Sequence, residues 1–99
     1  MKIVVIGYGR VGSRTVASLL DRGHQITIVD KEASRLGRAS QLENVELVQG
    51  NGIDVDVQRE AGIGDADILL AVTRDDNVNL MAAQVARILP RPCRDRPCV

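Results

Sequence analysis

Aromatic side chains are almost missing from this sequence of 99 residues, which has one tyrosine, Tyr8, and no phenylalanine or tryptophan. Proteins that bind single-stranded nucleic acids stack the bases on aromatic rings, so this composition argues against that class. The 13 basic residues are balanced by 13 acidic ones, and the formal net charge is zero. The chain therefore has no overall attraction for DNA, RNA or an anionic membrane, and we expect no nucleic-acid partner.

Metal-ligating residues and long apolar runs are equally scarce. The two cysteines, Cys93 and Cys98, lie in the last seven residues, and the single histidine, His24, lies far from them in the sequence. These ligands are too few for a zinc site, so we expect no metal and interpret the cysteines as incidental thiols. No apolar run reaches 18 residues, and the run from Ile3 to Ile6 is too short for a signal peptide. We therefore expect a cytoplasmic protein.

Aliphatic residues make up most of the apolar 44% of the chain, and their spacing alternates between strand and helix patterns. This composition suits a parallel sheet that is buried on both faces. Four β-α units in succession predict an α/β fold, a Rossmann-like doubly wound parallel sheet in the order 3-2-1-4. The expected strands are residues 2–6, 25–29, 45–48 and 67–72, and helices are expected after the glycine-rich loop as far as residue 22, and over 31–39, 55–61 and 75–89.

The composition changes sharply at residue 90. All three prolines and both cysteines lie in "PRPCRDRPCV", residues 90–99. Proline cannot donate to a helix or to a central strand, so this stretch is expected to be a disordered tail at a place where a fifth strand would otherwise follow. We accordingly predict one Rossmann-like domain over residues 1–89, with a sheet that is truncated at its far edge.

The stretch "VVIGYGRVGS", residues 4–13, carries the spacing G-x-G-x-x-G. This pattern alone is weak, but here it directly follows a predicted strand and opens a predicted helix. In that setting the first glycine makes a tight turn, the second admits a pyrophosphate, and the third allows the helix to pack on the strand. The side chain of Arg10 either contacts phosphate or is solvated. The candidate cofactor-binding residues of this loop are Gly7, Tyr8, Gly9, Arg10, Val11 and Gly12.

Asp30 ends the second predicted strand, 18 residues after Gly12. An acidic residue near this spacing accepts hydrogen bonds from the ribose hydroxyls and repels a 2′-phosphate. The sequence therefore favours NAD(H) or ADP/ATP over NADP, and it does not distinguish between these two ligands. The alternative is a solvated aspartate at a strand end. Lys31, a further candidate, and Arg35 lie close by in the sequence and soften the discrimination against NADP.

Later loops complete the candidate site. Asn51 and Gly52 follow the third strand and either touch the adenine edge or form a plain turn. Thr73 follows the fourth strand and either bonds a ribose or belongs to the entry of the last helix. His24 falls at the opposite end of the sheet and is interpreted as a surface residue. No catalytic constellation is apparent and 99 residues leave no room for a substrate domain, so we do not expect an enzyme.

Several segments together resemble the N-terminal lobe of the RCK family (regulator of potassium conductance), also called the Trk N-terminal or TrkA-N domain. The resemblance covers residues 1–89. The loop pattern "G-D-A/G-T" of the family corresponds here to "GNGI", in which Asn51 and Ile53 replace the usual Asp and Thr. The other matching positions are Ala61, Gly62, Ile63, Ala66, Asp67, Thr73, Asp76 and Asn79.

This resemblance implies a regulatory subunit of a Trk- or Ktr-type potassium transport system. Such a lobe binds NAD(H) or ADP/ATP, forms a homodimer or a higher oligomer, and gates a membrane subunit at the inner face of the plasma membrane. Leu80 and Ala83 widen the apolar face of the last helix beyond one stripe, so we expect this helix to contribute to a subunit contact. Two alternatives stay open: an NAD-binding fragment of an oxidoreductase, and a structural module that binds no nucleotide.

Overall fold

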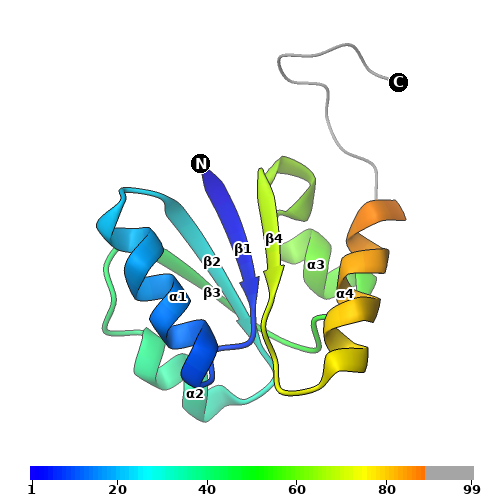
Figure 1. Ribbon diagram of the computed structural model, residues 1–99, viewed down its shortest axis with the longest axis horizontal. Coiled ribbons are helices and arrows are strands. Elements are labelled where there is room, and N and C mark those ends of the chain that lie inside the picture. Colours follow the sequence, from blue (N-terminus) through cyan, green and yellow to red (C-terminus); the bar gives the residue numbers. More distant parts are fainter. Residues whose placement is uncertain (89–99) are drawn as a thin grey trace.

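The computed structural model describes residues 1–88, in which strands and helices alternate along the chain (Figure 1). The apolar runs form the strands β1 (Lys2–Ile6), β2 (Gln25–Asp30), β3 (Val45–Gln49) and β4 (Ile68–Ala71). Between and after them lie the helices α1 (Arg10–Asp21), α2 (Ala33–Ala39), α3 (Val55–Glu60) and α4 (Asp76–Ile88), with a short 3-10 helix, η1 (Ile63–Asp65), before β4.

All four strands are parallel and lie in the order β3-β2-β1-β4, as the sequence predicts. Ile3 of β1 is paired with Ile26 of β2 on one side and with Ile68 of β4 on the other. The chain moves outward in one direction from β1 to β3 and then crosses back to β4. The switch point therefore lies between β1 and β4, where ligands of such sheets bind.

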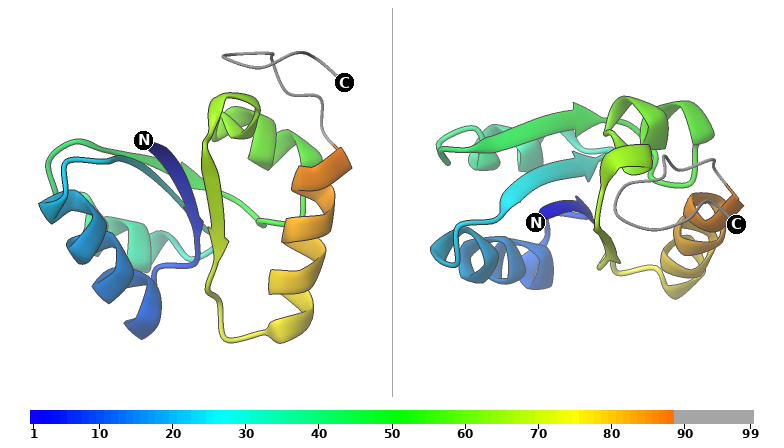
Figure 2. Two further views of the ribbon diagram at one scale, coloured as in Figure 1. Left: turned by 45° about the horizontal axis from the view of Figure 1, so that its top comes forward. Right: turned by 90° about the horizontal axis from the view of Figure 1, so that it is seen from above.

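The helices cover both faces of the sheet (Figure 2). Alternate residues of β1 point to opposite faces, as the pleat of a strand requires. Ile3 and Val5 pack with Val16 in the cluster beneath α1 and α2, whereas Val4 and Ile6 pack in the cluster beneath α3 and α4. The two clusters explain why β1 is apolar without alternation: both of its faces are core.

The structure differs from the predicted elements mainly at their ends. β2 and β3 each extend one residue further than expected, to Asp30 and Gln49, and β4 is shorter, at Ile68–Ala71. The segment after α3 forms η1, a short helix that the sequence did not predict. The predicted tail, residues 90–99, lies outside the described residues. Among residues 1–88, no helix combines the length and the apolar character needed to cross a bilayer.

Candidate functional site

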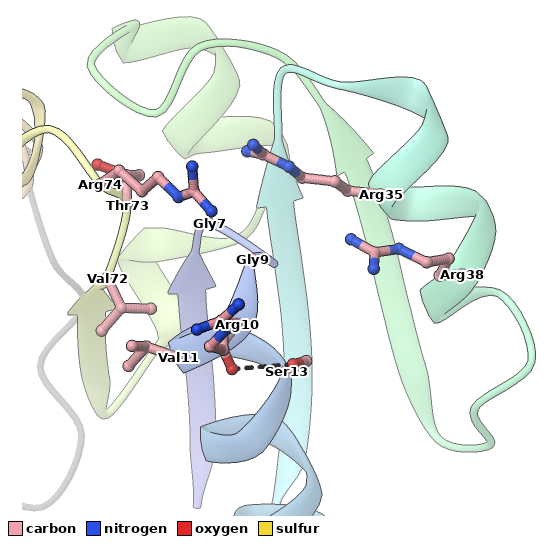
Figure 3. A pocket seen from close by; sticks show the side chains of 10 residues that line it. All are labelled: Gly7, Gly9, Arg10, Val11, Ser13, Arg35, Arg38, Val72, Thr73 and Arg74. Atoms are coloured by element: carbon pink, nitrogen blue, oxygen red, sulfur yellow. Dashed lines mark hydrogen bonds between the residues drawn. The ribbon is translucent and has the colours of Figure 1, made fainter.

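The carboxyl ends of the strands and the N-terminus of α1 surround a pocket of about 680 Å³ (Figure 3). A second hollow of about 190 Å³ shares three of its lining residues, so the two adjoin. Of the predicted residues, the larger pocket is lined by Gly7, Gly9, Arg10, Val11 and Thr73. The smaller hollow is lined by Asp30, Lys31, Asn51, Gly52 and again Thr73.

Two predicted residues lie behind the pocket wall. The Tyr8 side chain is buried in the cluster beneath α1 and α2. Gly12 is also buried, and a Cβ atom at this position would overlap the carbonyl oxygen of Gly7. This close approach of α1 to the loop is the role expected for the third glycine, and it makes Gly12 a structural residue.

The first and second glycines differ in what surrounds them. Gly7 has φ +102°, a conformation that side chains with a Cβ rarely adopt, and its N–H donates to the carbonyl of Val29 over 2.8 Å. Gly9 has an extended backbone with φ −86°. A Cβ atom on Gly9 would have no heavy atom within 4 Å, so the protein itself does not require glycine there.

Asp30 is buried at the end of β2, with a relative exposure of 4%. Its Oδ2 accepts a hydrogen bond from the Tyr8 N–H, and its Oδ1 accepts one from the Glu32 N–H, both over 2.8 Å. Arg35 approaches Oδ2 to 3.6 Å as its ionic partner. The carboxylate therefore fixes the glycine-rich loop to β2, a role that the sequence did not reveal.

This double contact predicts a stability effect for Asp30→Asn. An asparagine has a single acceptor oxygen, so its amide NH₂ would face one of the two backbone N–H groups. A buried donor left without an acceptor costs about 2 kcal/mol, and urea unfolding is expected to show that loss. Glu46→Gln on β3 is the matched control, because Glu46 is exposed and should change by less than about 0.5 kcal/mol. Equal stability of Asp30→Asn and the unmodified chain would contradict the role.

Thr73 belongs to a hydrogen-bonded loop before α4. Its N–H and its hydroxyl both donate to Oδ1 of Asn79, over 2.9 and 2.6 Å. Asn79 in turn donates from Nδ2 to the Thr73 carbonyl over 3.0 Å. The predicted threonine thus lines the pocket with a hydroxyl that the loop already uses, and Asn79 positions it. The Asp75 carboxylate accepts hydrogen bonds from the Asn77 and Val78 N–H groups at the start of α4.

The loop after β3 forms the floor of the smaller hollow. Asn51 accepts a hydrogen bond from the Ile53 N–H through Oδ1 over 3.2 Å. A Cβ atom on Gly52 would overlap the Ile6 side chain, so glycine is required by packing. Gln58, which is 1% exposed, donates from Nε2 to the Gly52 carbonyl over 2.7 Å and to the Ala82 carbonyl over 2.9 Å. This buried amide ties the loop to α4.

Four arginines make the larger pocket strongly basic. Arg10 comes from α1, Arg35 and Arg38 from α2, and Arg74 from the loop before α4. Arg10 and Arg35 were considered from the sequence, whereas Arg38 and Arg74 were not predicted. Arg35 and Arg38 are three residues apart on one helix, a spacing that places side chains on the same face and was the available signal.

In the described part of the chain, side chains that could bind a metal ion are not clustered at the pocket. Within the described part of the chain, no three His, Cys, Asp or Glu side chains are placed to hold a metal ion. His24 lies beyond the opposite end of the sheet, where its Nδ1 is 3.2 Å from the amino group of Met1. The pocket therefore offers backbone N–H groups and guanidinium groups, which are suited to binding anions.

Comparison with known sequences gives a consistent family. The profile of the TrkA-N domain matches residues 3–94. A Trk system potassium uptake protein TrkA from Vibrio alginolyticus is 42% identical over 86 residues, which is 87% of this chain and 19% of that protein. Proteins of the same name from Haemophilus influenzae and Streptomyces coelicolor are 36% and 40% identical, over 90% and 88% of this chain and 19% and 39% of their own lengths. The chain spans about a fifth of the Vibrio and Haemophilus proteins.

Solved structures show the same fold at lower identity. The TrkA-N domain of the inner membrane protein ybaL from Escherichia coli has a TM-score of 0.80 and 22% identity, covering 87% of this chain and 63% of that one. A structure described as the Shewanella denitrificans Kef CTD in AMP bound form has a TM-score of 0.75 and 23% identity, covering 88% of this chain and 52% of that one.

Proposed function

The chain belongs to the TrkA-N domain family, and on that premise we propose that it is a nucleotide-sensing module of a potassium uptake system. It would bind an adenine nucleotide, NAD(H) or ADP/ATP, and its conformation would tell a membrane subunit which nucleotide is bound. The observation that carries this proposal is the basic pocket in front of Gly9, at the switch point of a Rossmann-like sheet.

The larger pocket fits the phosphate groups of such a ligand. The open space at Gly9 would let phosphate approach the backbone closely. No side chain caps the N-terminus of α1, so its N–H groups and the positive end of its dipole are available to an anion. Arg10 begins this helix, and its guanidinium group would add a charged hydrogen-bond donor.

The smaller hollow fits the adenosine part. Asp30 lines this hollow, and each oxygen of its carboxylate has a second lone pair beyond the one used by a backbone N–H. The ribose hydroxyls would donate to these lone pairs, with Lys31, Asn51 and Gly52 around them. The AMP of the Kef structure supports an adenine nucleotide in a fold of this kind.

A regulatory role follows from the family rather than from catalytic residues. The relatives are named as potassium uptake proteins, which favours a sensor over the alternative, an NAD-binding fragment of an oxidoreductase. In a sensor, a nucleotide acts by binding one conformation more tightly than another. We propose a cytoplasmic location beside the membrane subunit, and a homodimer or larger ring in which the exposed Leu80 on α4 contributes to the contact.

A ligand panel tests the proposed function. Thermal unfolding of the full chain would be measured with NAD⁺, NADH, ADP and ATP, with GTP as the base control. A ligand at about 100 times its Kd is expected to stabilise the fold by about 2.7 kcal/mol. Absence of any shift with all adenine nucleotides would contradict the proposal. NADH oxidation by the chain with a small-molecule substrate would favour the oxidoreductase instead.

A further inference from the structure

The four arginines of the larger pocket are brought together from three separate parts of the fold. Figure 3 shows Arg35 and Arg38 extending from α2, and Arg74 from the opposite side, toward the space in front of the glycine-rich loop. Arg10 lies between them at the start of α1. Clustered like charges repel one another, so an anion in the space between them would reduce this repulsion and be attracted by all four side chains.

Most of this positive charge has no ion-pair partner among residues 1–88. Arg35 is 3.6 Å from Asp30, and this is the one ion pair among residues 1–88. Arg10, Arg38 and Arg74 therefore have no carboxylate within salt-bridge range in the described structure. The two acidic side chains nearby, Asp30 and Asp75, line the smaller hollow and accept backbone N–H groups.

A dinucleotide does not require so many cations. The glycine-rich loop and the helix N-terminus bind a pyrophosphate diester through backbone N–H groups. Each phosphate of a diester carries about one negative charge, whereas a terminal phosphate carries about two and has three acceptor oxygens. Guanidinium groups match such a terminal phosphate through paired hydrogen bonds. The excess of arginines therefore corresponds to a ligand with a terminal phosphate beyond the one attached to adenosine, as in ADP and ATP.

We propose that Arg38 and Arg74 are specificity-determining residues that make the pocket select adenine nucleotides by their number of phosphate charges. ATP and ADP then bind more tightly than AMP or NAD⁺. This inference rests on the proposed function, because it concerns the phosphate half of the same site. Under this proposal, two residues outside the glycine-rich loop determine which of the ligands that contain adenosine and phosphate binds most tightly.

Isothermal titration of the full chain, in EDTA so that Mg²⁺ does not neutralise the phosphates, tests this inference. Dissociation constants would be measured for AMP, ADP, ATP, NAD⁺ and inorganic tripolyphosphate. For the unmodified chain, ATP is expected to bind at least about tenfold more tightly than AMP or NAD⁺, the effect of about one charged hydrogen bond. The preference should fall as the salt concentration rises, because exposed charges are screened.

Variants assign the effect to particular residues. Arg38→Gln and Arg74→Gln are each expected to weaken ATP by about tenfold while changing AMP by less than about twofold. Arg22→Gln is the matched control, since Arg22 is exposed at the far end of α1. It should leave all five constants unchanged.

The outcomes separate the two proposals. Equal affinity for AMP, NAD⁺ and ATP would overturn the inference and leave nucleotide binding intact. Loss of AMP binding in the arginine variants to the same degree as ATP binding would also overturn it. Failure of every nucleotide to bind, or binding of tripolyphosphate as tightly as ATP, would overturn the proposed function, and the inference with it.

Discussion

Replacing Gly9 by alanine is expected to weaken the binding of adenine nucleotides by at least about 100-fold, which corresponds to the loss of about 3 kcal/mol of charged hydrogen bonds. The physical reason is the open space beside Gly9. A Cβ atom there meets no heavy atom of the protein within 4 Å, so its methyl group would occupy the volume through which phosphate approaches the backbone. Titration of the variant with the tightest ligand of the panel measures the effect.

The stability of the same variant distinguishes a binding role from a structural one. Gly9 has an extended conformation that alanine adopts without strain, so the free energy of unfolding without ligand should stay within about 1 kcal/mol of the original. Gly37→Ala on α2 is the matched control: it is exposed, a Cβ atom there also meets nothing within 4 Å, and its binding should be unchanged. Unaltered nucleotide affinity in Gly9→Ala would show that phosphate does not bind at this loop.

The strand order and the core follow directly from the sequence. Four short apolar runs separated by helical patterns leave few parallel arrangements, and the handedness of β-α-β crossovers removes most of those. The run from Ile3 to Ile6 is buried on both faces, which is why its lack of alternation indicated a central strand. The 3-10 turn of η1 was missed because its formation depends on Gly62, whose φ of +80° depends on how the chain packs beside β1.

The site was predicted less completely because several contacts depend on tertiary packing. Asp30 was identified from its spacing, but its bonds to two backbone N–H groups depend on where the loop from Gly7 turns back over β2. Gln58 gave no signal, since a glutamine in a short charged helix is ordinarily solvated. Its burial results from α4 lying over α3. Arg74 lies three residues after the end of β4, and the direction of its side chain is set by the loop that Thr73 and Asn79 close.

Gly12→Ala is expected to have the largest effect on stability, a loss of more than about 3 kcal/mol. The added methyl group would overlap the Gly7 carbonyl oxygen and lie 3.4 Å from Cγ2 of Val72. A flexible side chain would move aside, but the overlapping atom belongs to the backbone of a turn held by the Gly7–Val29 hydrogen bond. The strain therefore displaces α1 from the sheet, together with Val16, which it buries.

Thermal unfolding measures this loss as a decrease in Tm of more than about 12 °C, since a domain of this size shifts by about 4–8 °C per kcal/mol. The Gly37→Ala control should instead gain up to about 1 kcal/mol, because alanine favours the helix over glycine. Gly9→Ala and Gly12→Ala should therefore behave differently, although the two glycines lie three residues apart in one motif. The fold requires Gly12, whereas the ligand requires Gly9. A Tm for Gly12→Ala within about 4 °C of the original would contradict the close packing of α1 on the loop.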